Sequence, residues 1–166
     1  MAELEILQYP DERLKQVCDE VTLFDDALRT FVAALEATMR AGPGGIGIAA
    51  PQVGRLERIA IVDLSARKKL KQHGRVVLVN PEIIEWQGSA VGREGCMSLP
   101  DYTGNVVRAE TITLEAQDEF GEHQRYEMAG FEARVVQHEL DHLDGLLFLD
   151  RLVSRRSDLF KRKVYQ

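Results

Sequence analysis

Two histidines in the last third of the chain have the spacing of metal ligands on a helix. His138 and His142 stand four positions apart. In a helix they would lie about 40° apart around the axis and one turn apart along it, so both imidazoles would face the same point. Glu139 would stand about 60° from His142, at the edge of the same arc. The pattern predicts two ligands of a metal site, beside a carboxylate that can act as base for a metal-bound water.

Such a site needs a third ligand, since the same spacing also occurs by chance on solvated surface helices. Metallopeptidases with this motif take that ligand from further along the chain. Here Phe148 stands where one such class has its third His, and no Glu follows Glu139. A lone cysteine such as Cys96 is more often a small core residue, but thiolate and imidazole together suit Fe(II), Zn(II) or Co(II). We therefore predict a site formed by Cys96, His138 and His142, with one position left for water.

A run of small residues, Gly45–Gln52, offers a second part of a site. Because glycine and alanine have almost no side-chain bulk, this backbone can approach a ligand closely. Gln52 ends the run with an amide that can donate and accept hydrogen bonds. It is not a phosphate loop, because neither Lys-Ser/Thr nor a helix-opening GxGxxG follows. The alternative to a ligand-binding loop is a tight packing loop with a surface Gln. The predicted metal site elsewhere in the chain favours the ligand-binding loop.

Hydrophobic periodicity predicts the elements that must position these groups. Apolar residues at i, i+3, i+4, i+7 and i+11 indicate an amphipathic helix over 25–40, ended by Gly42-Pro43. Gly130 is expected to open the motif helix, and Asn80-Pro81 indicates an edge strand or an interrupted one. Strands are expected over 58–64, 76–86, 106–117 and 123–128, and a short helix over 154–165.

The whole chain has the composition of one globular domain, 1–166. It is 45% hydrophobic and 29% charged, with a formal charge of -6 that argues against a dedicated nucleic-acid binder. The tail 151–166 holds six basic residues and one acidic residue, so it carries about +5 against about -11 for the rest. We expect no signal peptide, no membrane span, a cytoplasmic location and no disulfide framework, with Cys18 a buried or idle thiol.

Three segments together resemble the peptide deformylase family, which removes the formyl group from the N-formylmethionine of nascent bacterial and organellar proteins. The family motifs are a GxGxAAxQ loop, an EGCxS segment and a QHExDH helix. They stand here in that order at 45–52, 94–98 and 137–142, and the likeness extends over about 6–153. Met97 is a departure, since Leu is commoner there, and Arg134 is another, beside the expected pocket.

The resemblance implies an α+β fold with antiparallel strands packed around a central HExxH-bearing helix, an N-terminal helix and a short C-terminal helix. It implies one divalent ion, usually Fe(II), with Zn(II), Ni(II) or Co(II) also possible. The metal ligands would be Cys96, His138 and His142. Glu139 would move the proton from water to the leaving amine, and the Gln52 amide and the Met97 backbone N–H would stabilise the oxyanion.

The same resemblance assigns roles in substrate binding and support. Backbone groups around Ile46 and Gly47 would pair with the extended peptide. Apolar side chains would hold the methionine, namely Ile46, Phe131 and Val135. Ion pairs would keep the motifs in place through Glu94, Arg108 and Asp141. The partners implied are formylated nascent peptides, with weak ribosome docking through the basic tail; we expect a monomer that contacts no membrane and reads no nucleic-acid sequence.

Two other hypotheses remain open from the residues alone. A general metallopeptidase would cleave internal peptide bonds with the same Glu139, but its downstream third ligand is missing. A non-catalytic protein would bind only metal or formylated peptides. The presence of Gln52, Cys96 and Glu139 together counts against that hypothesis, because a binding module needs no general base.

Overall fold

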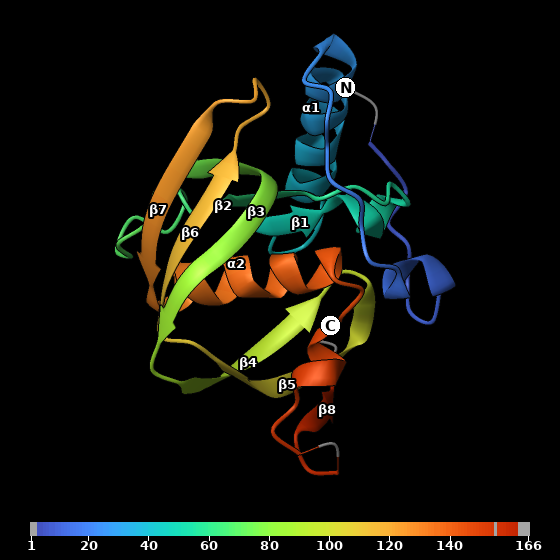
Figure 1. Ribbon diagram of the computed structural model, residues 1–166. Coiled ribbons are helices and arrows are strands. Elements are labelled where there is room, and N and C mark those ends of the chain that lie inside the picture. Colours follow the sequence, from blue (N-terminus) through green and yellow to red (C-terminus); the bar gives the residue numbers. More distant parts are fainter. Residues whose placement is uncertain (1–2, 155, 163–166) are drawn as a thin grey trace.

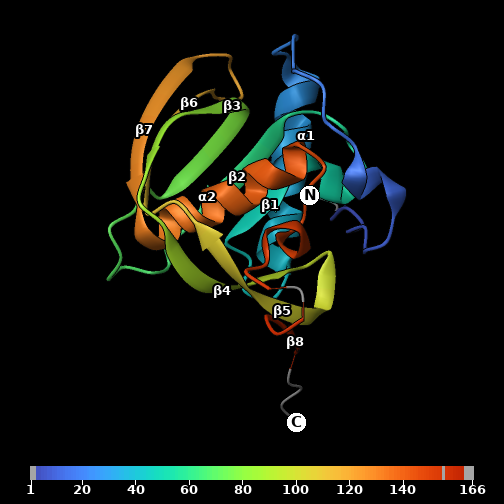
Figure 2. The ribbon, with the colours of Figure 1, turned by 60° about the horizontal axis from the view of Figure 1, so that its bottom comes forward.

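A computed structural model describes residues 3–154 and 156–162. The helix α2, Gly130–Leu143, lies between two antiparallel sheets, as both views of the ribbon show (Figure 1 and Figure 2). The larger sheet has the order β1-β2-β3-β6-β7, and the smaller one has the order β4-β5-β8. The larger sheet consists of β1 (Gly47–Ala49), β2 (Ile59–Asp63), β3 (Arg75–Gln87), β6 (Thr111–Gln117) and β7 (His123–Ala129). The smaller sheet consists of β4 (Ala90–Cys96), β5 (Leu99–Arg108) and β8 (Leu159–Lys161). Three short 3-10 helices complete the fold: η1 (Glu12–Lys15), η2 (Ala50–Val53) and η3 (Phe148–Arg151).

β2 and the first half of β3 are buried on both faces of the larger sheet because a helix covers each face there. Along β2, Ala60 and Val62 pack in the cluster that includes the α2 side chains, whereas Ile59 and Ile61 pack in the cluster of α1 (Asp26–Ala41). This is the alternation with period two that a strand imposes. A continuous apolar run therefore marks a central strand covered on both sides.

The helix α1 begins and ends as its sequence predicts. The Asp25 side chain accepts a hydrogen bond of 2.9 Å from the Leu28 N–H and caps the first turn. Leu28, Val32 and Leu35 face the larger sheet, and Gly42 ends the helix. The predicted range 25–40 agrees with the structure to one residue at each end.

The α+β fold class is confirmed, but three details of the prediction need correction. The single strand expected over 106–117 is two strands, because β5 ends at Arg108 and β6 begins at Thr111 in another sheet. The C-terminal helix expected over 154–165 is wrong where the chain is described, since Leu159–Lys161 forms β8 beside β5; residues 155 and 163–165 lie outside the described ranges. β3 is interrupted at Asn80, as predicted, but it is not an edge strand.

The interruption in β3 has a local cause. Asn80 adopts a φ of 52°, and the register with β6 shifts between Val79 and Glu82. Its side chain binds the backbone of Val21, accepting from the N–H at 2.8 Å and donating to the carbonyl at 2.8 Å. Asparagine tolerates a positive φ better than most residues. The same residue therefore forms the bulge in β3 and holds the N-terminal segment at Val21 against the sheet.

In the described ranges, no helix has both the length and the apolar character that a membrane crossing requires.

Candidate metal centre

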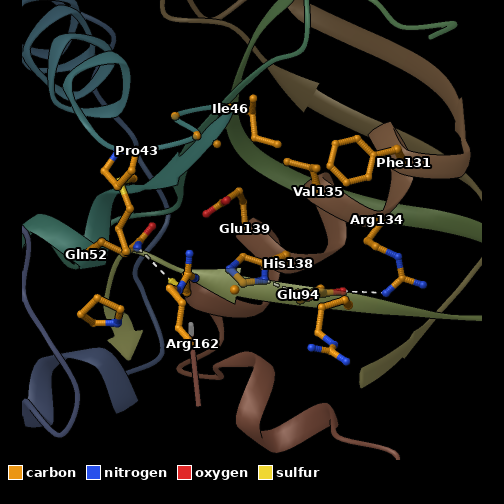
Figure 3. Close-up of a pocket in the computed structure, with 18 residues that line it drawn as sticks. Pro43, Ile46, Gln52, Glu94, Phe131, Arg134, Val135, His138, Glu139 and Arg162 are labelled. Atoms are coloured by element: carbon orange, nitrogen blue, oxygen red, sulfur yellow. Dashed lines mark hydrogen bonds and ion pairs between the residues drawn. The ribbon is translucent and has the colours of Figure 1, made fainter. Parts of the chain in front are cut away.

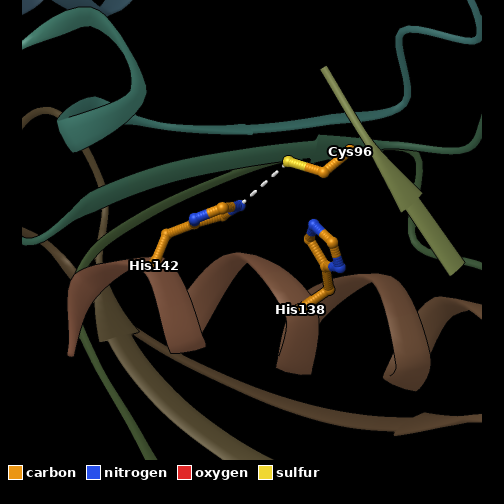
Figure 4. A group of neighbouring side chains, drawn as sticks. All are labelled: Cys96, His138 and His142. Carbon is orange, nitrogen blue, oxygen red and sulfur yellow. Dashed lines mark hydrogen bonds between the residues drawn. The ribbon is translucent and has the colours of Figure 1, made fainter. Parts of the chain in front are cut away.

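The three predicted metal ligands come together in the fold, namely Cys96, His138 and His142. His138 lies 42 positions after Cys96 in the sequence. Their donor atoms all lie within 4.8 Å of one another, and all three side chains are buried (Figure 4). The two imidazoles lie one turn apart on α2 with ring centroids 5.0 Å apart. The Cys96 Sγ at the end of β4 is 3.4 Å from His142 Nε2.

The position of Cys96 follows from the alternation of β4. Glu94 and Cys96 are two residues apart, so their side chains share a face, and both are buried toward α2. Glu94 Oε1 lies 2.8 Å from His138 Nδ1, while Cys96 approaches His142. The Nδ1 contact leaves His138 Nε2 to face the cluster, as the second nitrogen of a ligating histidine does.

The residues present fit a divalent metal ion. One thiolate and two imidazoles leave the fourth position of a tetrahedral site open, which is the arrangement of catalytic metal centres. Glu139 Oε1 and His142 Nδ1 are buried and have no hydrogen-bond partner within residues 3–154 and 156–162. A buried carboxylate oxygen without a partner is costly unless a ligand or water completes it.

Burial tunes the ionisable groups of the cluster. It raises the pKa of Glu139 to about 7, against the opposing charge of His138. It also holds the pKa of His142 well below its ordinary value, so this imidazole is neutral and free to ligate. Burial would lower the pKa of His138 too, but interactions with Cys96 and Glu94 raise it well above the ordinary range. Metal binding at this cluster should therefore release a proton.

A pocket of about 520 Å³ opens onto the cluster (Figure 3). It is lined by all of the predicted substrate-binding and catalytic residues and by two of the three predicted metal ligands: Ile46, Gly47, Phe131 and Val135; Gln52, Met97 and Glu139; and Cys96 and His138. His142 is outside its lining and is only 1% exposed. The predicted groups thus share one cavity, and the cluster of Cys96, His138 and His142 lies at its base.

Gly47 brings the backbone of β1 against the proposed base. A Cβ at this position would lie 2.5 Å from Glu139 Oε2 and 3.1 Å from Val135 Cγ1. Only glycine leaves room there, which explains why the small-residue run is needed beside the motif helix. The close approach also excludes water from one side of Glu139.

Gln52 is fixed in one orientation by three contacts. Its Oε1 accepts from the Ala49 N–H at 3.0 Å, and its Nε2 lies 3.1 Å from Ser98 Oγ and 3.4 Å from Cys96 Sγ. The amide N–H groups therefore point to the metal cluster rather than to solvent. Met97, in the turn between β4 and β5, also lines the pocket.

A buried ion network holds β4 against α2. Arg108 donates to both oxygens of Glu94, at 3.0 and 2.9 Å, and its other terminal nitrogen bonds Asp141. Burial alone would raise the pKa of Glu94, but hydrogen bonds from His138 and Arg108 outweigh it and lower the pKa to about 2. The two carboxylates, Glu94 and Asp141, thus meet at the Arg108 guanidinium, and Glu94 also contacts His138.

Three arginines of the pocket lay outside the predicted roles. Arg134 lines the pocket as expected, but its guanidinium is bound to Glu94 at 2.8 Å and to two backbone carbonyls. Its position four residues before His138 is the signal that could have placed it in the network. Arg93 and Arg162 also line the pocket. Arg162 had no such signal, because the C-terminal segment was expected to be a helix.

The chain resembles known proteins over almost its full length. The family model described as polypeptide deformylase matches residues 3–158. Peptide deformylases of Thermodesulfovibrio yellowstonii and Acidobacterium capsulatum are 39% and 43% identical, over 98% and 96% of this chain and 97% and 92% of theirs. A solved peptide deformylase from Legionella pneumophila is 39% identical with a TM-score of 0.85, covering 93% of this chain and 90% of that one.

Proposed function

This chain belongs to the polypeptide deformylase family, and from that premise we propose that it works as a metal-dependent hydrolase through Cys96, His138, His142 and Glu139. Family membership makes it a hydrolase that removes the N-terminal formyl group of nascent peptides. The observation that carries the residue assignment is the buried Cys-His-His cluster beside Glu139 at the base of one pocket. Membership also favours this activity over a general metallopeptidase or a binding-only protein.

Cys96, His138 and His142 would hold one divalent ion. We propose Fe(II) as the ion bound in the cell, with Zn(II), Ni(II) or Co(II) also suited to the donor set. When bound, such an ion supplies Lewis-acid chemistry, acidifying a water and polarising a carbonyl. Glu94 would keep the His138 ring in its ligating orientation through the 2.8 Å contact with Nδ1.

Glu139 would move the proton. Its Oε1 has no hydrogen-bond partner in the described part of the chain, and its pKa of about 7 suits a group that both takes and returns a proton near neutral pH. In this proposal Glu139 accepts the proton of the attacking water and donates it to the leaving amine. The products are formate and a free N-terminus.

Two donors would stabilise the negative oxygen that develops on the formyl carbon. The Gln52 amide is supported as one donor because its Nε2 already points at Cys96. The Met97 backbone N–H is the second, supported by its position in the turn after Cys96. Donors fixed before the reaction need no reorganisation when charge develops.

The peptide would bind as an added strand. Within residues 3–154 and 156–162, β1 pairs only with β2 and β4 only with β5, so each of the two sheets has an open edge beside the pocket. The Ile46 carbonyl already accepts from the Asp63 N–H at 2.9 Å, and the backbone of the next residue, Gly47, alternates in direction along the strand. We therefore assign the pairing to backbone groups around Ile46 and Gly47. Ile46, Phe131 and Val135 would hold the methionine side chain.

Weak ribosome docking through the tail remains a proposal. Arg156 and Lys161 are exposed and could meet an acidic surface, whereas Arg151 is bound to Asp141. Arg155 and Lys163 lie outside the described ranges.

The test is release of formate from a formyl-Met-Ala-Ser peptide by protein loaded with Fe(II) without oxygen. Glu139→Ala should lower kcat by about 10²–10⁴-fold, because the proton relay is lost. Glu122→Gln, a change at an exposed carboxylate, should leave the rate unchanged. Co(II) absorption spectra would show that Glu139→Ala still binds metal.

Either of two results would contradict the proposal. One is a folded, metal-loaded parent protein that releases no formate. The other is an unimpaired Glu139→Ala variant, which would assign the proton transfer to another group.

A further inference from the structure

Arg162 extends from the end of β8 into the mouth of the pocket (Figure 3). Its backbone N–H donates to the Asp101 carbonyl at 2.7 Å, which continues the pairing of β8 with β5. Phe160, two residues earlier, pairs with Thr103, and Thr103 pairs in turn with Gly95. Residues two apart on a strand share a face, so Arg162 lies on the face of the smaller sheet to which Gly95 belongs.

Gly95 allows the guanidinium of Arg162 to lie directly on β4. A Cβ at Gly95 would be 2.4 Å from Arg162 Nη2 and 3.5 Å from its Cζ. Gly95 precedes Cys96, so the charged group of the C-terminal strand lies one residue from a proposed metal ligand. The guanidinium thereby reaches the open edge of β4, where the peptide would run.

Arg93 adds a second positive charge to this part of the pocket. Its Cζ lies 3.9 Å from the centroid of the Phe160 ring, and it donates to Asn105 Oδ1 and Thr103 Oγ1 at 3.1 and 3.2 Å. These partners are all neutral. Among the described residues, no carboxylate lies within 4.0 Å of the guanidinium nitrogens of Arg93 or Arg162.

The carboxylates that line the pocket are already committed. Glu94 is bound by Arg108 and Arg134, and Glu139 is buried beside the metal cluster. The mouth of the pocket therefore holds two guanidinium groups that make no ion pair with a carboxylate within the described ranges. A guanidinium that keeps its fork of donors free is suited to a carboxylate.

We propose that Arg162, with Arg93 beside it, is a specificity-determining residue that favours formylated peptides with an acidic side chain at the second or third position. This rests on the proposed function, which places the formyl group at Cys96 and the methionine against Val135. The following residues must then leave the pocket past Gly95 and Arg162. An acidic side chain would meet two cations there, and a basic one would be repelled.

The experiment compares formyl-Met-Ala-Glu-amide, formyl-Met-Ala-Gln-amide and formyl-Met-Ala-Lys-amide with the metal-loaded full chain. The parent should prefer Glu over Lys by about two- to fivefold in kcat/KM at low salt, through KM, because both groups remain partly solvated. Arg162→Gln should reduce the Glu-to-Lys ratio of kcat/KM to about one. Arg162→Lys should retain part of the preference for Glu. Added salt should weaken the preference of the parent.

A matched control uses the neighbouring cation. Lys161→Gln removes the same charge from the same strand at an exposed residue outside the pocket lining, so its Glu-to-Lys ratio should equal that of the parent. Formyl-Met-Ala-Ser with a free C-terminus, compared with its amide, separates an α-carboxylate from a side chain. A preference seen only for the free C-terminus would overturn the assignment to acidic side chains.

The failures of the two proposals give different results. If every peptide is deformylated and Arg162→Gln keeps the ratio of the parent, the role of Arg162 is overturned and the proposed function stands. If the folded, metal-loaded parent deformylates none of the peptides, both are overturned.

Discussion

The two cysteines of the chain differ in chemistry because of where each thiol lies. Cys96 lines the pocket and contacts Gln52 Nε2 and His142 Nε2, both at 3.4 Å. Cys18 is 5% exposed in the core, and burial raises the pKa of its thiol to about 11, against the opposing charge of Arg58. The thiolate is the reactive form, so Cys18 should be inert in the folded protein.

Alkylation of the metal-free protein by iodoacetamide at pH 8 should therefore modify Cys96 alone. At that pH a thiol with a pKa of about 11 stays protonated, and its burial also keeps the reagent away, so Cys18 should be labelled in the unfolded chain but not in the folded one. Mass spectrometry of peptides after timed labelling measures both sites. Zn(II) should protect Cys96, and Cys18→Ala should leave the labelling of Cys96 unchanged; early modification of folded Cys18 would refute its burial.

At the scale of residues, the sequence predicted those site residues whose type and spacing were enough to assign them. Helical spacing placed His138, His142 and Glu139 on one arc, and the need for a soft third ligand identified Cys96. Arg162 could not be found in this way, because its role depends on β8 pairing with β5 and on the missing side chain of Gly95. The glycine is visible in the sequence, but the pairing that places Arg162 over it is a property of the assembled sheet.

At the scale of elements, Arg108 joins β5 to β4 and α2. Its side chain is 4% exposed and contacts two carboxylates, Glu94 and Asp141. Arg151 contacts the same Asp141 at 3.2 Å, but its side chain is 49% exposed. The two arginines therefore share one acceptor and differ in burial.

Arg108→Met should lower the free energy of unfolding by about 3–5 kcal/mol, because it removes the buried cation that Glu94 and Asp141 share. Arg151→Gln should lower it by no more than about 1 kcal/mol, since water replaces an exposed pair. Urea unfolding followed by circular dichroism measures both values. Equal losses in the two variants would show that burial does not set the strength of this network.

Elements with a strong apolar pattern were predictable, and those without one were not. β2 and the apolar half of β3 have continuous apolar runs because α1 and α2 cover both faces of the larger sheet. β4 contains two glycines and two charged residues, so its strand character comes from pairing with β5 rather than from its own composition. The break between β5 and β6 was also hidden, because Arg108 is buried by its ion pairs rather than by apolar contacts.

At the scale of the whole molecule, the metal ligands join parts that already have their own cores. α2 packs with the larger sheet in one cluster, and Cys96 belongs to another with Leu99, Val106 and Phe148. A chain of 166 residues buries enough apolar surface to fold without a metal. A bound ion would therefore tie the smaller sheet to α2 without being required for folding.

Removal of the metal by a chelator should leave the far-ultraviolet circular dichroism unchanged and lower Tm. With ligand at about 100 times Kd, binding stabilises the folded state by about 2.7 kcal/mol, which corresponds to about 5–10 °C for a domain of this size. Thermal unfolding with and without Co(II) measures the difference. Cys96→Ser, which replaces the thiolate by a poor ligand for these ions, should lose most of the response to Co(II) while keeping its secondary structure. Unfolding of the parent on chelation would instead show that the ion holds the two sheets together, because the apolar clusters alone would then be too weak.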